Sequence, residues 1–357
     1  MSIRREEIED WLRETAHDRL VRLWERADAT RRRQVGEAVH LRGLVEISNH
    51  CARQCAYCGL RAGRAGLARY RLTVDETLAC ARLATELGCG TLVLQAGEDP
   101  GLSADWVAEA IRRIKGETPL ALTLSLGERD DAELALWRAA GADRYLLRFE
   151  TSNLALYERL HPARPDRRAD RIDILLRLRA LGYEIGSGVM IGLPGQTWRD
   201  LTNDIARFAE LDLDMIGVGP YLPHPDTPLG AEPGAAAVPG DGQVPNDELT
   251  TLKAIALARL ACPRANIPST TALATLDRRS GHELALERGA NVVMPNLTPV
   301  GYRSRYEIYP DKECCHEEPA SSVARVRRRV EALGRHVGSG PGSARERSGA
   351  VVATKGR

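Results

Sequence analysis

Three cysteines near the start of the chain have a spacing that suits metal chemistry. Cys51, Cys55 and Cys58 form a C-x3-C-x2-C arrangement in the segment SNHCARQCAYCGL. Three thiolates on one loop can bind three iron atoms of a cubane cluster and leave its fourth iron open to another ligand. A structural zinc site or a fully ligated cluster needs one more ligand, for which His50 is the neighbouring candidate. The spacing also fits one face of a helix, where free cysteines pack as small apolar side chains.

The residues around these cysteines favour a loop over a helix. Asn49 and Gly59 bracket the segment, and both residue types are typical of loops. The apolar run 44–47 precedes it and predicts a strand. In α/β barrels the active site lies at the carboxyl ends of the strands, where this loop would be. The segment therefore predicts a cluster with one open iron, with a zinc site and a buried structural role as the alternatives.

The elements that must position this loop alternate along the chain. Short apolar runs rich in β-branched residues are separated by amphipathic helical patterns, two of which begin with capping boxes, Thr73 with Glu76 and Thr197 with Asp200. Such repeats predict a parallel sheet, and at 357 residues a complete (β/α)8 TIM-type barrel is favoured over an open doubly wound sheet. The predicted strands are 44–47, 91–95, 120–124, 144–149, 185–191, 215–218, 265–268 and 291–294.

The barrel is expected to carry extensions at both ends. Residues 1–40 predict an N-terminal helical extension and 41–312 the barrel, in which 230–245 is rich in Gly, Ala and Pro and predicts a long loop. Residues 313–334 predict a C-terminal helical segment. The Gly/Ser/Arg-rich stretch 335–357 predicts a disordered tail.

Charge and hydropathy exclude two classes of partner. The 50 Lys and Arg residues balance 49 Asp and Glu residues, so the net charge of +1 is not that of a nucleic-acid-binding protein. No stretch reaches the roughly 20 apolar residues of a membrane span, and the N-terminus does not have the pattern of a secretory signal. We therefore expect a cytoplasmic protein, in which cysteines stay reduced and serve metals or catalysis more often than disulfides.

The cysteine motif, with aromatic Tyr57 before its last cysteine, resembles the radical S-adenosylmethionine (SAM) superfamily. The resemblance implies one [4Fe–4S] cluster on Cys51, Cys55 and Cys58, with SAM chelating the open iron and yielding a 5′-deoxyadenosyl radical. It also implies a set of cofactor-binding residues near the strand ends: Tyr57, Gln95, Gly97, Glu98, Thr123, Ser125, Glu150 and Arg171.

Further segments resemble one subgroup, the HydE-type maturases of [FeFe]-hydrogenase. They include TLVLQAGEDP, LTLSLGE, ADRYLLRFET, HPDTPL and NVVMPNLTP, and they run in order from about residue 4 to 310. This resemblance implies a small iron–cysteine substrate bearing CO and cyanide, whose cysteine sulfur the radical attacks. It implies as partners the companion maturases and a low-potential donor such as ferredoxin or flavodoxin. The implied substrate-cavity residues are Arg148, Met215, Thr270, Thr271, Met294, Tyr306 and Tyr309.

The C-terminal cysteines depart from the pattern of relatives that carry an auxiliary cluster. The candidate ligands next to Cys314 are only Cys315 and His316, and no further cysteine follows them. We therefore predict no second cluster and interpret these thiols as surface residues. The same departure argues against a biotin-synthase-like sulfur inserter. The remaining alternatives are a radical SAM enzyme on another small molecule, such as a methylornithine synthase, and a non-catalytic iron–sulfur or zinc scaffold.

Overall fold

The computed structural model describes residues 3–162, 170–231, 242–313, 315 and 317–344. Most of the loop predicted at 230–245, the tail beyond residue 344, Cys314 and His316 lie outside these ranges. In the part that is described, no helix is both long enough and apolar enough to cross a membrane.

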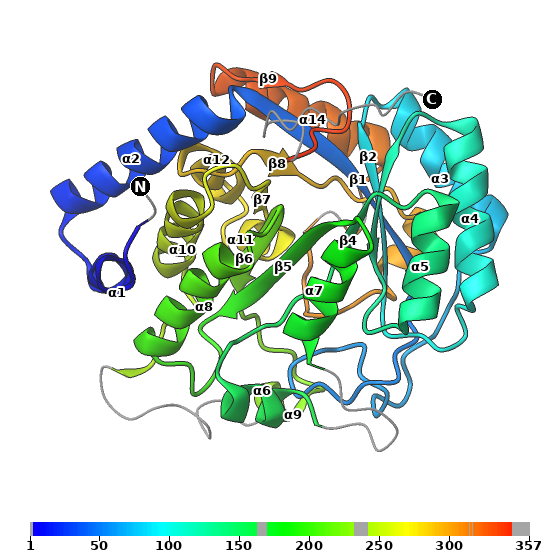
Figure 1. Cartoon of the computed structure of the whole chain (residues 1–357), viewed down its shortest axis with the longest axis horizontal. Helices are drawn as coiled ribbons and strands as arrows, with labels where there is room; N and C mark the ends of the chain where they lie inside the picture. Colours follow the sequence, from blue (N-terminus) through cyan, green and yellow to red (C-terminus); the bar gives the residue numbers. More distant parts are fainter. Residues whose placement is uncertain (1–2, 163–169, 232–241, 314, 316, 345–357) are drawn as a thin grey trace, which may run out of the picture.

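Eight parallel strands form a barrel, and helices surround it (Figure 1). The strands neighbour one another in the order β6-β5-β4-β3-β2-β1-β8-β7, which confirms the predicted fold class. The strands are β1 Ala38–Ser48, β2 Thr91–Ala96, β3 Ala121–Ser125, β4 Arg144–Leu146, β5 Glu184–Ile191, β6 Met215–Pro220, β7 Pro268–Ser269 and β8 Val292–Val293.

Strands β6 and β7 are joined through a single bridging residue and not through a ladder of paired residues. Asn266, just before β7, forms an isolated bridge with Met215. Its carbonyl accepts a hydrogen bond from the Ile216 amide at 3.0 Å, and its own amide donates to the Asp214 carbonyl at 2.9 Å. These bonds complete the ring, so the barrel is closed at its weakest junction by backbone atoms of a single asparagine.

The helices begin where their capping residues predict. Thr73 and Thr197 each form a full capping box, because the side chain bonds to the amide three residues on and the acidic residue there bonds back. The helices that cover the barrel are α3 Val74–Glu86, α4 Ala104–Glu117, α5 Asp131–Ala140, α6 Leu154–Leu160, α7 Arg171–Ala180, α8 Trp198–Glu210, α9 Pro228–Ala231, α10 Glu248–Ala261, α11 Thr271–Leu276, α12 Gly281–Glu287 and α13 Val300–Arg303.

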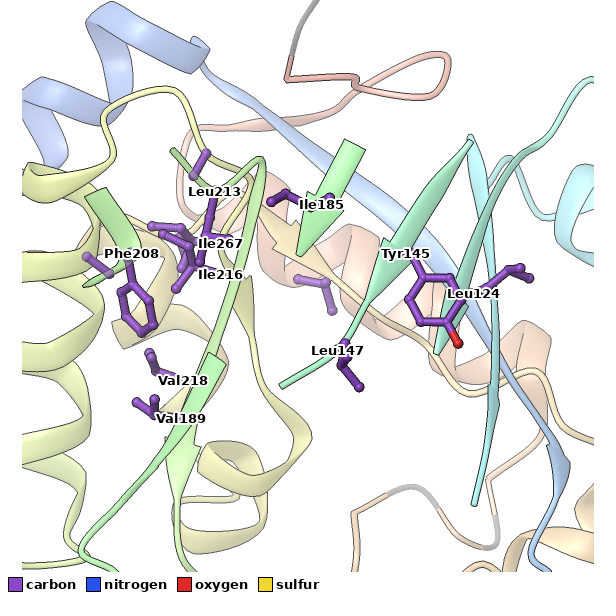
Figure 2. Packing of buried hydrophobic residues seen from close by; sticks show 14 of the residues in the cluster. Leu124, Tyr145, Leu147, Ile185, Val189, Phe208, Leu213, Ile216, Val218 and Ile267 are labelled. Atoms are coloured by element: carbon purple, nitrogen blue, oxygen red, sulfur yellow. The ribbon is translucent and has the colours of Figure 1, made fainter. Parts of the chain in front are cut away.

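Strand residues alternate between the helices outside and the lumen inside. Figure 2 shows the outward-facing side chains of β5 and β6, among them Ile185, Val189, Ile216 and Val218, which are fully buried. Phe208 of α8 is buried with them in the same apolar cluster. This shell of apolar contacts fixes the strands and leaves the other set of residues facing the lumen.

Two N-terminal helices, α1 Arg5–Arg13 and α2 His17–Val35, pack outside the barrel against α8 and α10. At the other end of the chain, α14 Pro319–Ala332 leads into strand β9 His336–Val337. The prediction of a disordered tail from residue 335 is wrong for residues 335–344, because β9 pairs in parallel with the start of β1. Backbone pairing supplies order that the Gly/Ser-rich composition does not reveal.

Residues 338–343 then cover the amino-terminal end of the barrel. Arg144 donates hydrogen bonds to the Pro341 carbonyl at 3.1 Å and to Ser343 Oγ at 2.8 Å, and Asn266 donates to the Gly342 carbonyl at 2.8 Å. We call residues 338–343 the plug. In Figure 1, β9 lies at the top of the view and the loop after β1 at the bottom, so the plug and the cysteine loop occupy opposite ends.

Candidate active site

The cysteine loop follows β1 and is held by backbone bonds to three other segments. The amides of Ala52, Ala56 and Gly59 donate to the carbonyls of Glu98, Leu160 and Ile308 at 2.8, 2.8 and 3.0 Å. These bonds tie the loop to the ends of β2 and α6 and to the segment after β8. The loop is therefore positioned by the barrel mouth.

Gly97 is where the loop crosses the end of β2. A Cβ atom placed on Gly97 would lie 2.2 Å from the His50 carbonyl oxygen and 2.8 Å from Cys51 Cβ. Real Cβ atoms do not approach a neighbour this closely, so only glycine lets the two segments meet. Gly97, which the family resemblance places among the cofactor-binding residues, is thus also the point where the turn after β2 passes the cysteine loop.

The three thiols lie in surroundings that disfavour a bare charge. Cys55 is buried and Cys51 and Cys58 are partly buried, with no disulfide to any of them. Burial raises the pKa of the Cys55 thiol to about 11 and also raises the pKa of Cys51 and Cys58. Thiolates need a compensating cation here, and a bound metal centre supplies one.

The ligand geometry separates two of the predicted metal centres. Within the described ranges, no three side chains of His, Cys, Asp or Glu converge on the position of one metal ion, His50 included. A cubane presents a different iron atom to each thiolate, so its ligands need not converge. The donor set therefore fits an iron–sulfur cluster better than a mononuclear zinc site.

A buried network of charges lies beside the cysteine loop. Arg53, between the first two cysteines, approaches Glu128 Oε2 at 3.4 Å and Glu98 Oε1 at 4.0 Å. Arg171 Nε binds Glu128 Oε1 at 2.9 Å and Arg171 Nη1 donates to the Arg148 carbonyl at 2.7 Å. Two predicted cofactor-binding residues, Glu98 and Arg171, are thus brought together through Arg53 and Glu128, which the sequence reasoning missed.

Glu150 follows β4 with a strained backbone. Its φ is +64°, a left-handed conformation that is uncommon for residues other than glycine. Burial raises the pKa of its carboxyl group, although Arg148 and Arg171 act in the opposite direction. Glu150 Oε2 lies 3.1 Å from Arg148 Nη2, an ion-pair contact without hydrogen-bond alignment. Strain together with a poorly satisfied carboxylate is typical of a ligand-binding position.

Tyr57 is partly buried between the cysteines and α6. Its hydroxyl lies 2.8 Å from His161 Nε2, while His161 Nδ1 lies 3.2 Å from the Tyr157 carbonyl. A carbonyl only accepts, so Nδ1 carries the proton and Nε2 accepts from Tyr57. Burial lowers the pKa of His161, which keeps the ring neutral and this arrangement fixed.

The lumen below the mouth holds the predicted substrate residues. Gln95 Nε2 donates to Tyr306 Oη at 3.2 Å, and Arg42 Nη1 contacts Met215 Sδ at 3.0 Å across the barrel. Thr123 Oγ1 and Arg148 Nε are buried without a hydrogen-bond partner among the described residues. Buried polar atoms are normally bonded, so these two are available to a ligand.

Two cavities meet at a lysine that the sequence reasoning did not select. Tyr306, Tyr309 and Lys312 line an open cavity of about 460 Å³, and Thr271, Met294 and Lys312 line a smaller one of about 30 Å³. The buried Lys312 Nζ binds Glu46 Oε1 of β1 at 2.5 Å.

Comparison with known proteins assigns this site to a family. The Radical SAM superfamily matches residues 45–208. The [FeFe] hydrogenase maturase subunit HydE of Thermotoga maritima is 45% identical over 317 residues, which cover 88% of this chain and 86% of that protein. The chain belongs to the HydE family of radical SAM enzymes.

Solved structures agree with this family assignment. The crystal structure of methylornithine synthase superposes with a TM-score of 0.80 at 25% identity, covering 97% of this chain and 96% of that one. The maturase HydG superposes with a TM-score of 0.75 at 20% identity, covering 94% and 72%, and at that identity it shows the shared fold alone. The predicted enzyme class, reductive cleavage of SAM by a radical SAM barrel, is therefore confirmed.

Membership in the HydE family also shows what signal was overlooked. Arg53 stands inside the cysteine motif and Glu128 ends the segment LTLSLGE, so both belong to segments that carry the resemblance. Arg53 follows β1, Glu128 follows β3 and Arg171 begins α7. Their ion pairs therefore join segments that are distant in sequence, which no local pattern displays. Glu46 and Lys312 lie 266 residues apart and had no sequence signal at all.

Proposed function

We propose that the protein is an [FeFe]-hydrogenase maturase of the HydE type that acts on a small anionic iron–cysteine complex bearing CO and cyanide. The 45% identity to the Thermotoga subunit supports the role in maturation. One structural observation carries the substrate class: Arg148 and Thr123 present buried polar atoms that no described residue satisfies. A compact anion with hydrogen-bond acceptors would satisfy both.

The cofactor site is proposed at the mouth. Cys51, Cys55 and Cys58 would hold one [4Fe–4S] cluster, which with bound SAM supplies a 5′-deoxyadenosyl radical. Glu150, Ser125 and Arg171 would bind the polar groups of SAM, and a cation beside Glu150 would relieve the cost of burying its carboxylate. The remaining proposed cofactor contacts are Tyr57, Gln95, Gly97, Glu98 and Thr123.

The substrate is proposed to lie deeper in the lumen. The guanidinium of Arg148 would balance its negative charge, and the hydroxyls of Thr270 and Thr271 would donate to cyanide or carboxylate. Met294 and Tyr306 would complete the contacts, with Met215 and Tyr309 beside them. The cysteine sulfur of the complex is the proposed point of attack, in a barrel interior that keeps water from the reaction.

The partners follow from the same proposal. Companion hydrogenase maturases would supply the complex and receive the product, and a low-potential ferredoxin or flavodoxin would reduce the cluster. We propose a cytoplasmic protein with no second cluster.

Anaerobic reconstitution with iron and sulfide, followed by dithionite and SAM, tests the proposal. The wild-type protein should release 5′-deoxyadenosine, and the synthetic iron–cysteine complex should accelerate that release. Cys55→Ala should abolish it, whereas Cys262→Ala, which removes a buried cysteine outside the loop, should retain it. A colourless protein that binds zinc would overturn the enzyme class, and release unaffected by the complex would overturn the substrate alone.

The fold similarity to methylornithine synthase supports a second candidate substrate, a free amino acid. The same assay separates the two. Acceleration by an amino acid in place of the iron complex would favour this alternative.

A further inference from the structure

We infer that Gly217 is a specificity-determining residue, whose missing side chain leaves the space in the lumen that a compact substrate occupies. The inference rests on the proposed function and names how the same site selects its substrate by size.

Gly217 faces the lumen. Its neighbours on β6, Ile216 and Val218, are fully buried on the opposite, outward face (Figure 2). Met215, two residues earlier and on the same face as Gly217, contacts Arg42 of β1 at 3.0 Å. Strands β7 and β8 separate β1 from β6 in the sheet order, so that contact crosses the inside of the barrel.

The space beside Gly217 is open. A Cβ atom built on this residue meets no other atom within 4 Å, and the residue keeps accessible surface although it lies in the middle of a strand. Its φ is also outside the left-handed region. Neither crowding nor backbone conformation therefore requires glycine at this position.

The other lumen-facing glycines of β5 and β6 differ in this respect. A Cβ on Gly188 would lie 1.9 Å from the Gly217 carbonyl, on Gly219 2.7 Å from Thr270 Oγ1, and on Gly186 2.8 Å from Leu146 Cδ1. Packing explains the absence of a side chain at each of these three. Gly217 alone among the four has no such explanation.

Glycine within a strand is less stabilising than alanine, and it often marks a site where a ligand approaches closely. Gly217 pairs in register with Gly188, so two neighbouring strands carry no side chain at the same level. The Gly188 carbonyl accepts a bond from the Glu150 amide at 3.1 Å, which ties this level to the turn that carries Arg148. The recess therefore lies two strands along from the turn of Arg148, whose cation would balance the charge of the substrate.

A graded series at Gly217 tests the inference. Alanine and valine are both more favourable than glycine within a strand, so Gly217→Ala and Gly217→Val should fold while they fill the recess stepwise. Overfilling of this kind should weaken binding of the synthetic iron–cysteine complex about 10-fold for alanine and about 100-fold for valine. Gly116→Ala is the matched control, since this exposed glycine at the end of α4 also has no atom within 4 Å of a built Cβ.

The outcomes distinguish the inference from the proposed function. Graded loss of complex binding in the Gly217 variants, with Gly116→Ala like wild type, supports the inference. Equal binding by wild type and Gly217→Val overturns it and leaves the substrate standing. A loss confined to SAM binding overturns it as well, because the space would then belong to the nucleoside. Failure of the wild type to bind the complex overturns the proposed substrate and, with it, the ligand named here.

Discussion

Arg144 and Arg148 lie four residues apart near β4, yet their side chains are satisfied in opposite ways. Arg144, at the plug end, donates to Glu184 at 2.6 Å, to Thr91 Oγ1 at 3.0 Å and to two residues of the plug. Arg148, at the mouth, has one ion-pair contact to Glu150 and a buried Nε without a partner in the described ranges. At the plug end the arginine side chain stabilises the fold, whereas at the mouth the arginine side chain keeps a donor available to a ligand.

The contrast extends beyond the two arginines. At the plug end, backbone carbonyls of residues 341 and 342 meet buried donors of Arg144 and Asn266. In the lumen Thr123, and at the mouth Glu150, keep buried oxygens without hydrogen bonds to described residues, and Glu150 is strained. Unsatisfied buried groups destabilise the folded chain, so the mouth costs stability that ligands restore on binding.

Replacing each arginine by methionine should have the largest effect and tests the contrast directly. Arg144→Met removes a buried ion-pair contact to Glu184 and should lower the free energy of unfolding by about 3–5 kcal/mol. Arg148→Met should lower it by only about 1 kcal/mol, since that arginine is poorly bonded, but it should weaken binding of the iron complex. Chemical denaturation of the two cluster-free variants at one pH measures both losses of unfolding free energy. Equal losses of stability would break the comparison.

A smaller effect is expected from an added methyl group under the plug. A Cβ on Gly90 would lie 1.7 Å from the Gly340 carbonyl oxygen, and backbone cannot yield as a side chain can. Gly90→Ala should therefore displace the plug and destabilise the protein by about 1–3 kcal/mol. Limited proteolysis should then cut the C-terminal segment sooner than in wild type or in Gly116→Ala. An unchanged cleavage rate would show that the plug does not seal this end.

The smallest effect concerns the pH dependence of stability near the mouth. Asp204 of α8 accepts bonds from the Ser152 amide and hydroxyl at 2.5 and 2.6 Å, just beyond Glu150, and burial raises its pKa to about 7 from 3.8. Between these values Asp204 in the folded protein binds the extra proton, so its contribution to stability falls as the pH rises from about 4 to 7 and is constant above.

Asp204→Asn removes this titration. The difference in unfolding free energy between pH 5 and pH 8 should shrink by on the order of 1 kcal/mol, with the variant the more stable protein at pH 8. Denaturation at the two pH values measures it, with the exposed Asp105→Asn as control. An unchanged pH difference would mean that Asp204 titrates as it does in the unfolded chain.

The sequence predicted the fold well where local patterns determine it. Strand and helix order, the capping boxes and the barrel follow from apolar periodicity and short-range hydrogen bonds. The predicted strand 265–268 overlaps β7 at Pro268 alone, and the predicted strand 291–294 is reduced to β8, because β7 and β8 pair with their neighbours over two residues only. The N-terminal helical extension predicted for residues 1–40 contains two helices, α1 and α2.

The candidate site, like the fold, could be predicted only where local sequence features determine it. The cysteine spacing, with Asn49 and Gly59 on either side, predicted the cysteine loop, since these features are local. The pairing of Arg53 with Glu128, the Lys312–Glu46 ion pair and the plug depend on residues distant in sequence, and composition even suggested disorder for the plug. Long-range contacts of this kind are decided by the closed barrel, which no short window contains.

The plug also sets the order of events during synthesis. Arg144 and Asn266 bond to residues 341–343, so these contacts of the barrel can form only after that late segment has been made. The cysteine loop is synthesised long before that segment. The loop therefore waits beside an unfinished barrel until the C-terminal segment arrives.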